Sequence, residues 1–494
     1  YNQQGGTLGG PIKQNKIFYF LSYEGTRERQ FAQKFTTVPT ASMRAGDLNV
    51  GNTNIFDPMI GDANGRGRQP FAGNLIPQNR IDPIARKLIS DSRWPLPNSA
   101  GTGSLGLTQN FLGQGNTLFD RDTLDSKVNF NHNEKWSSFV RFSYLDYSML
   151  NDQVFGYFGG VELHPTNSNA GRGFGTSYSG TISTTYVVSP TLVFDAYYGY
   201  TLMDTNVEQN NLDENIGRDV LGIPGTNGTR RFEGGWPRLR IDGFGDLGIT
   251  NDFMPYYRND PQSQYVANAN WTKGRHEVRF GLDYYNQHLN HNQPEFPGST
   301  GPAQGGLRFR QGTTQLNGGP PANDMNSFAS FLLGQANEAG KILQYPEEYR
   351  TRTQMFSAYV RDRWQVTPRL TMSYGVRWEN YPFPTRDNRG LERYDFATNQ
   401  MFVCGVGNVP RNCGVGVSKK LFAPRFGIAW RATDSFVVRA GYGISIDPFN
   451  WARPLRTNYP IMFVQNLVAP NNFSAATTFQ QGLPAIPAPP TGGV

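Results

Sequence analysis

Hydrophobic and polar side chains alternate along several segments of the chain. From Leu370 to Asn380, apolar side chains occupy every second position, and polar or small side chains occupy the positions between them. A two-residue period predicts a β-strand with two different faces. Phe356 to Arg363 alternates in the same way, and Val366-Thr367-Pro368 separates the two segments. Because proline presets φ and cannot donate to a ladder, we expect a hairpin with its turn at this proline.

Four more pairs of alternating segments flank short turns, and a further strand without a partner is predicted at Ile17 to Glu24. Together these segments give eleven predicted strands. The four pairs are residues 127–131 with 136–147, 178–188 with 191–202, 264–271 with 276–289, and 422–431 with 436–446.

Long connections rich in Asn, Gly, Pro and Asp separate the predicted hairpins. Soluble domains rarely contain structureless connections longer than about 15 residues. Short turns that alternate with long loops are typical of outer-membrane barrels. The sequence therefore predicts an all-β fold, a transmembrane antiparallel outer-membrane β-barrel with long extracellular loops and short periplasmic turns. The long connections cover roughly residues 25–124, 148–177, 204–262, 290–353 and 381–421.

Alternation alone does not separate a face in lipid from a face in a soluble core. Tryptophans near the predicted strand ends favour lipid, since interfacial girdles of membrane barrels are rich in Trp and Tyr. We therefore expect outer-membrane lipid around a girdle that includes Trp136, Trp271, Trp378 and Trp430.

Composition narrows the possible classes further. The chain has 56 Gly and 33 Pro among 494 residues, which disfavours a helical bundle, and 13% aromatic residues, which disfavours disorder. No run approaches the roughly twenty apolar residues of a helical membrane span. The net charge of +7 is too diffuse to indicate nucleic-acid binding.

Two features suggest that the chain is part of a longer protein. It begins at Tyr1 without a visible secretion signal and ends in a Pro-rich stretch. An odd number of strands cannot close an antiparallel barrel, so we expect further strands elsewhere in the protein.

Cys404 and Cys413 are nine positions apart. They could form a disulfide in an oxidising compartment or remain free thiols, and without nearby His they do not predict a zinc site.

Several motifs resemble those of TonB-dependent outer-membrane receptors, and more narrowly those of their Oar-like branch. The resemblance covers essentially the whole chain, and its motifs mark the fold rather than the cargo. They are Gly5-Gly6-Thr7-Leu8-Gly9-Gly10-Pro11-Ile12 followed by residues 16–25, Ile76 to Ala85, Ser330 to Gln335, and Phe422-Ala423-Pro424-Arg425-Phe426-Gly427.

The resemblance implies a barrel of about 22 strands filled by an N-terminal plug. Residues 1–12 would then end the plug, residues 13–447 would form about half of the barrel, and residues 448–494 would be an incomplete Pro-rich extracellular loop. The implied partners are the missing plug and remaining strands, the TonB complex, and an unknown solute imported with energy from the inner membrane. Alternatives are a non-transporting outer-membrane barrel for adhesion or surface organisation, and a secreted β-rich binding protein.

Catalytic chemistry finds little support in the sequence. The five His are scattered, and only His288 and His291 have a spacing that could suit a metal. Asp62-Ala-Asn-Gly65 lacks the Glu of a calcium loop and is better explained as an Asx-turn. We therefore expect no enzyme activity, no catalytic residue, no cofactor and no metal.

Charged residues on the polar faces of the strands are the first candidate site. Two interpretations stay open: the residues pair with one another across strands or contact a plug, or they guide anionic or polyhydroxylated solutes through the lumen. Aromatic residues in the long loops are a second candidate, for ligand stacking or for simple loop packing. The lumenal set is Arg141, Arg279, Arg361, Arg377, Arg425, Arg439, Glu277, Asp283 and Glu379, and the loop set is Phe253, Tyr256, Tyr257, Tyr345 and Tyr349.

Overall fold

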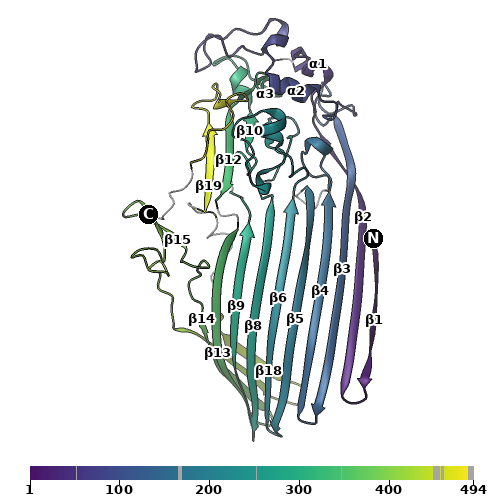
Figure 1. Ribbon diagram of the computed structural model, residues 1–494, viewed down its shortest axis with the longest axis vertical. Coiled ribbons are helices and arrows are strands. Elements are labelled where there is room, and N and C mark those ends of the chain that lie inside the picture. The colour runs from purple at the N-terminus through teal and green to yellow at the C-terminus, as the bar shows by residue number, and fades with distance from the viewer. Residues whose placement is uncertain are drawn as a thin grey trace.

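Twelve strands form one continuous antiparallel sheet (Figure 1). The computed structural model describes residues 1–51, 53–164, 170–251, 253–296, 298–345, 348–448, 457 and 461–487. Each strand of the sheet pairs with the next one along the chain. In order, they are β1 (Asn2–Lys13), β2 (Ile17–Thr36), β3 (Phe111–Asn133), β4 (Trp136–Asn151), β5 (Gly171–Ser189), β6 (Leu192–Glu208), β8 (Tyr256–Lys273), β9 (His276–Asn292), β13 (Tyr349–Thr367), β14 (Leu370–Asn380), β17 (Leu421–Arg431) and β18 (Val437–Gly443).

All five predicted hairpins are present, as β3–β4, β5–β6, β8–β9, β13–β14 and β17–β18. The predicted count of eleven strands is wrong, because Asn2–Lys13 pairs with β2 along its whole length. Four glycines in this strand hide the alternation of side chains. Twelve is an even number, so the argument from an odd strand count no longer applies. Within the described residues, β1 and β18 are the two unpaired edges of an open sheet.

Several strands extend further toward the long connections than the sequence predicted. β2 continues to Thr36 instead of ending at Glu24, and β13 begins at Tyr349 instead of Phe356. The predicted long connections are therefore too long at these points. The β2 extension was missed because charged and amide side chains appear there on both faces, and the β13 extension because threonines replace apolar residues on one face.

One face of the sheet exposes a continuous set of large apolar side chains. Phe280, Val360 and Val376 lie directly opposite one another on β9, β13 and β14, and are 44%, 46% and 37% exposed. A soluble sheet would bury such a face in a core, because that burial is the main driving force of folding. The exposed face therefore favours lipid. It also includes Val140, Phe142, Ile182, Phe194, Tyr265, Leu282, Phe426 and Tyr442.

The four tryptophans predicted to form a girdle lie near strand ends. Trp136, Trp271 and Trp430 are exposed on the apolar face beside the short turns. Trp378 lies at the opposite end of β14, where its indole N–H donates to Lys419 O (2.8 Å). Their contact with an interface stays a prediction.

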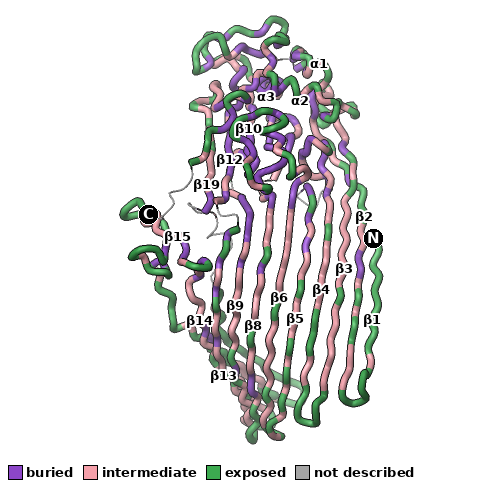
Figure 2. The backbone as a smooth tube through the Cα atoms, viewed as in Figure 1, coloured by how far each residue is buried: buried purple, intermediate pink, exposed green. Residues whose placement is uncertain are grey.

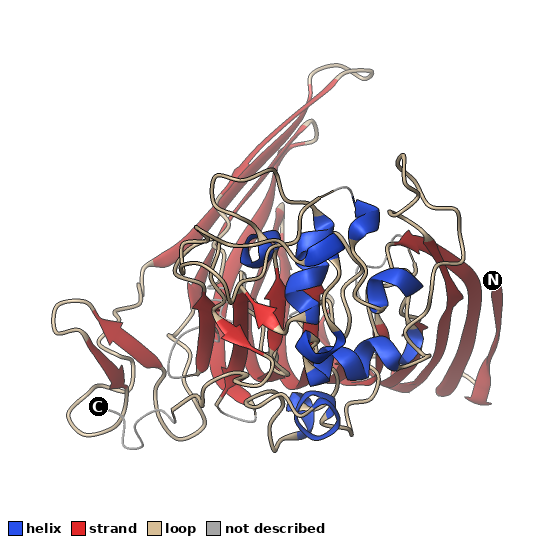
Figure 3. Cartoon of the chain, turned by 90° about the horizontal axis from the view of Figure 1, so that it is seen from above, coloured by secondary structure: helices blue, strands red, loops and turns tan. Residues whose placement is uncertain are grey.

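Most of the long connections fold together into a cap at one end of the sheet, whereas the connection between β14 and β17 lies beside the sheet (Figure 1). None of the helices in the described part of the chain is long and apolar enough to cross a membrane. Figure 3 shows the helices gathered together over the sheet end. The cap contains α1 (Ala41–Arg44), α2 (Pro83–Ser90), α3 (Asp324–Leu332) and a small sheet of β7 (Arg238–Ile241), β10 (Gly306–Phe309), β12 (Glu338–Gln344) and β19 (Met462–Val468).

Short elements complete the connections. β11 (Gln335–Ala336) pairs with β20 (Thr477–Thr478), and β15 (Glu392–Asp395) pairs with β16 (Gln400–Val403). The one-turn or two-turn segments are Asn49–Gly51, Ala72–Asn74, Gln78–Arg80, Gly156–Phe158, Ile216–Leu221, Arg231–Glu233 and Gln311–Thr314.

The cap has a hydrophobic core of its own, which Figure 2 shows as the main concentration of buried residues. Phe331 of α3 lies 5.9 Å from Trp94 and 5.8 Å from Phe479, measured between ring centroids. These rings come from connections that are far apart in the sequence. The connections are thus a packed unit rather than independent loops, and this packing holds the cap in one arrangement.

Candidate functional site

Three arginines form a row across the polar face of the sheet. Arg279 of β9 lies directly opposite Arg361 of β13, Arg361 lies opposite Gly375 of β14, and Gly375 lies opposite Arg425 of β17. Residues directly opposite in a sheet point to the same side. The row therefore lies on the face away from the exposed apolar side chains, on the predicted lumenal side.

The row destabilises the sheet unless anionic groups neutralise it, because like charges directly opposite one another repel. The nearest carboxylate atoms lie 3.9 Å from Arg279 (Asp195) and 3.9 Å from Arg361 (Glu277). Arg425 has no carboxylate within ion-pair distance among the described residues. The row thus carries more positive charge than its neighbours neutralise.

A pocket of about 410 Å³ opens over this row and is lined by Arg279, Tyr359, Arg361, Gly375, Arg377 and Arg425. Glycine is required at position 375, because a Cβ there would lie 2.6 Å from Val360 O and 2.9 Å from Arg361 Cα. The guanidinium groups donate hydrogen bonds and pair well with carboxylate or phosphate, whereas the Tyr359 hydroxyl already donates to Asn268 (2.7 Å). The pocket can therefore hold an anionic group.

The other predicted lumenal residues divide into paired and unpaired groups. Arg377 contacts Asp283 (3.3 Å) and Glu379 (3.0 Å), so its charge is balanced within the sheet. Arg141 pairs with Asp125 (2.8 Å). Arg439 has no ion pair with any part of the chain that the structure describes. Sequence reasoning missed Asp125 and Asp195, because the partner across a strand depends on register.

The loop aromatics do not form one cluster. Phe253 and Tyr256 pack with ring centroids 5.7 Å apart, and Tyr257 donates from its hydroxyl to Glu208 (2.9 Å). Tyr345 donates to Pro487 O. Tyr349 is fully buried beneath the Arg386 guanidinium, whose carbon lies 3.9 Å from the ring centroid. Tyr349 is therefore not accessible to a ligand, which corrects its place among the candidates.

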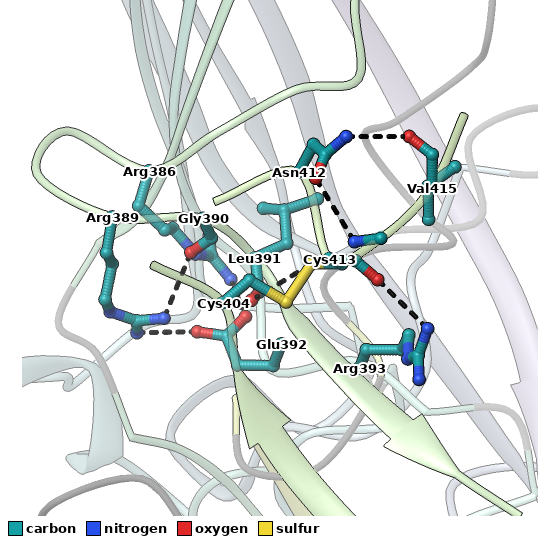
Figure 4. Close-up of a disulfide and its surroundings, with 11 residues drawn as sticks. Arg386, Arg389, Gly390, Leu391, Glu392, Arg393, Cys404, Asn412, Cys413 and Val415 are labelled. Atoms are coloured by element: carbon teal, nitrogen blue, oxygen red, sulfur yellow. Dashed lines mark hydrogen bonds and ion pairs between the residues drawn. A yellow bond between two sulfur atoms is a disulfide. The ribbon is translucent and has the colours of Figure 1, made fainter. Parts of the chain in front are cut away.

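Cys404 and Cys413 are joined by a disulfide inside the connection between β14 and β17 (Figure 4). Both cysteines are buried and pack with Leu391. Beside them, Arg386 and Arg389 reach Glu392 at 2.7 and 2.6 Å, and Arg393 donates to Cys413 O (3.0 Å). The disulfide therefore closes a small loop that an arginine–glutamate network holds in place.

Replacing both cysteines, Cys404→Ser with Cys413→Ser, should loosen this connection while the barrel stays intact. Closing a loop of this size contributes about 2–3 kcal/mol in the chain-entropy account. We expect trypsin to cleave after Arg411 at least tenfold faster in the variant, as measured by mass spectrometry of timed digests. Cleavage after Arg86 in α2 serves as the internal control and should be unchanged. Equal cleavage rates after Arg411 would show that the disulfide does not restrain the connection.

Metal binding has no support in the described ranges, where no group of three or more His, Cys, Asp or Glu could hold an ion. Asp62 accepts backbone hydrogen bonds from Asn64 (3.0 Å) and Arg66 (2.9 Å). These bonds confirm the predicted Asx-turn. The same connection contains α2, and Asp82 caps this helix by accepting from Ile84 N (2.8 Å).

Comparison with known families decides between the remaining fold classes. The family described as "Outer membrane beta barrel domain" matches residues 1–494, the whole length of the chain. The chain belongs to this outer-membrane β-barrel family. Membership agrees with the exposed apolar face of the sheet and places the protein in the bacterial outer membrane. This location excludes the secreted alternative. No curated protein matches the chain.

Three solved structures illustrate the similarity. The outer-membrane transporter YddB from Escherichia coli is 8% identical, with a TM-score of 0.41 over 89% of this chain and 46% of its own. The siderophore receptor PirA from Acinetobacter baumannii is 10% identical, with a TM-score of 0.40 over 89% and 40%. The ferric yersiniabactin uptake receptor FyuA from Yersinia pestis is 10% identical, with a TM-score of 0.36 over 88% and 43%. The chain spans less than half the length of each.

Proposed function

We propose that the protein is part of a TonB-dependent outer-membrane receptor of the Oar-like type. In this proposal, the cap binds a solute outside the cell, and the solute then passes along the polar face of the barrel. Energy comes from the inner membrane through the TonB complex, and a plug and further strands of the same protein complete the transporter. The proposal keeps residues 13–447 as a barrel segment and residues 448–494 as an external connection. Residues 2–13 form β1 and pair with β2, so the proposal no longer assigns residues 1–12 to the end of a plug.

The row of Arg279, Arg361 and Arg425 is the single observation that carries the proposal. A membrane anchor or adhesin needs no excess positive charge on the face turned away from lipid. The incompletely neutralised arginines would attract anionic solutes, because a charged cleft raises the local concentration of solutes of opposite charge. We therefore propose that the imported solute is anionic.

The alternative function, adhesion or surface organisation, draws on a different observation. The cap is a packed unit with its own hydrophobic core, and a rigid external surface suits stable recognition of another surface. This alternative predicts no import and no dependence on energy. The two functions therefore differ in a measurable way.

The test compares cells that carry the gene with cells that lack it. We expect the carrying cells to deplete a set of anionic solutes from the medium, as measured by untargeted mass spectrometry. A protonophore should abolish this depletion. The double variant Arg361→Gln with Arg425→Gln should slow it at least tenfold, because charge-assisted hydrogen bonds of about 1.5–3 kcal/mol each are lost. Arg369→Gln removes the same charge at an exposed turn and should have no effect.

Depletion that does not differ between the two kinds of cell would contradict the transport proposal and favour adhesion. Depletion that the double variant leaves unchanged would contradict the role of the arginine row.

A further inference from the structure

The outward face of the sheet is the face that carries the exposed apolar side chains. Tyr198, Tyr265 and Tyr284 lie opposite one another on this face, across β6, β8 and β9. Toward the cap on the same face, Asn206 lies opposite Tyr257, and Tyr257 lies opposite Asn292. The outward face thus changes from aromatic to amide side chains along these three strands.

The amide side chains line a pocket of about 410 Å³ on this outward face. Asp204, Asn206, Tyr257, Asn259, Asn290 and Asn292 contribute to its lining, from the cap-side ends of β6, β8 and β9. The pocket lies on the side of the sheet opposite to the arginine row. It is therefore separate from the proposed solute path.

The arginines at this pocket already pair with carboxylates, and Asp204 adds a further carboxylate, which accepts from the amides of Asn206 and Asn259. Arg231 pairs with Glu208 and lies 3.2 Å from Asp213. Arg258 pairs with Asp260, and Glu348 pairs with Arg350 at 3.0 Å. An incoming phosphate or carboxylate would thus meet carboxylates as well as arginines. The pocket suits a neutral ligand.

The amides keep hydrogen-bonding capacity for such a ligand. Asn206 and Asn259 each donate to Asp204, at 2.7 and 3.3 Å, and Asn290 donates to Asn259 O at 2.7 Å. An amide group has two N–H donors and a carbonyl oxygen, so each of these bonds uses only part of its capacity. Donors and acceptors side by side match the hydroxyl groups of a sugar, which both donate and accept.

We infer that this outward-facing pocket binds a neutral sugar unit. In the barrel architecture, long connections lie outside the cell, so the pocket faces the headgroup layer of the outer leaflet. Sugars reach this position either as the headgroups of outer-leaflet glycolipid or as free saccharides. The inference depends on the location in the outer membrane and does not depend on solute transport.

The test uses the full protein purified in detergent and three probes. The probes are intact lipopolysaccharide, the oligosaccharide released from it by mild acid, and dephosphorylated lipopolysaccharide. We expect the double variant Asn206→Leu with Asn259→Leu to bind intact and dephosphorylated lipopolysaccharide at least tenfold more weakly than the unchanged protein. Asn129→Leu removes an amide from the opposite face of the sheet and should bind like the unchanged protein.

The double variant could fail to fold, so the single variant Asn259→Leu, at an exposed position, provides a second test. It should weaken binding at least threefold. Equal binding of released oligosaccharide and intact lipopolysaccharide would identify a free-saccharide site, and binding only to the lipid-linked forms would identify a headgroup site. Both results support the inference. It is overturned if the protein binds none of the probes, if the variants bind normally, or if removal of phosphate abolishes binding.

Discussion

Ile182→Arg should destabilise the protein in the membrane by about 2–4 kcal/mol, the cost of a cationic side chain at the lipid-facing midplane of a barrel. Ile182 lies in the middle of β5, is 58% exposed, and belongs to the continuous apolar face. If water covered this face, replacing the exposed isoleucine by arginine would cost little stability. The expected loss of stability therefore arises only if lipid covers the face.

Ser183→Arg is the matched control, since the next residue of a strand points to the opposite, polar face. Stability is measured by urea unfolding of the protein in lipid vesicles. We expect Ser183→Arg to change the free energy of unfolding by less than about 0.5 kcal/mol, as is usual for surface substitutions. A small effect of Ile182→Arg, equal to that of the control, would mean that this face is not in lipid.

Phe331→Ala should lower the stability of the cap by about 3–5 kcal/mol, the usual cost of removing a buried phenylalanine ring. Phe331 is fully buried and contacts the rings of Trp94, Phe309, Phe328 and Phe479. Its removal leaves a cavity where connections distant in the sequence meet. The cap should therefore unfold before the sheet.

Tryptophan fluorescence during urea unfolding measures this effect, because Trp94 and Trp236 are buried in the cap. Phe396→Ala serves as the control, as its ring is 90% exposed in a connection. Unchanged unfolding of Phe331→Ala would show that the connections do not form a cooperative core.

The hairpins could be predicted because their chemistry is local. From Leu370 to Asn380 the alternation is regular, and Pro368 marks the turn before it. The first strand could not be predicted in the same way, since glycines at positions 5, 6, 9 and 10 carry no side chain to show a face. Local pattern therefore fixes strands only where both faces have distinct side chains.

The cap could not be predicted, because its core joins residues that no short window contains. Trp94 and Phe331 meet only after the intervening strands have paired. The connections also lack a regular apolar period. Sequence reasoning therefore treated them as long loops and placed the buried Tyr349 among accessible residues.

The candidate site was predictable in part. Alternation alone placed Arg279, Arg361 and Arg425 on polar faces, and the structure gives them one common face. Their alignment in a single row depends on strand register, which is set by long-range pairing. For the same reason, Asp125 and Asp195 could not be recognised as partners of Arg141 and Arg279.

We expect the twelve strands to span the outer membrane, with the cap outside the cell and the short turns on the inner side. Labelling of introduced cysteines in intact cells with a membrane-impermeant maleimide tests this topology. Met59 is 73% exposed in the cap, and Glu134 lies in the short turn between β3 and β4. We expect Met59→Cys to be labelled in intact cells and Glu134→Cys only after the outer membrane is permeabilised. Labelling of both positions in intact cells, or of Glu134→Cys alone, would rule out this topology.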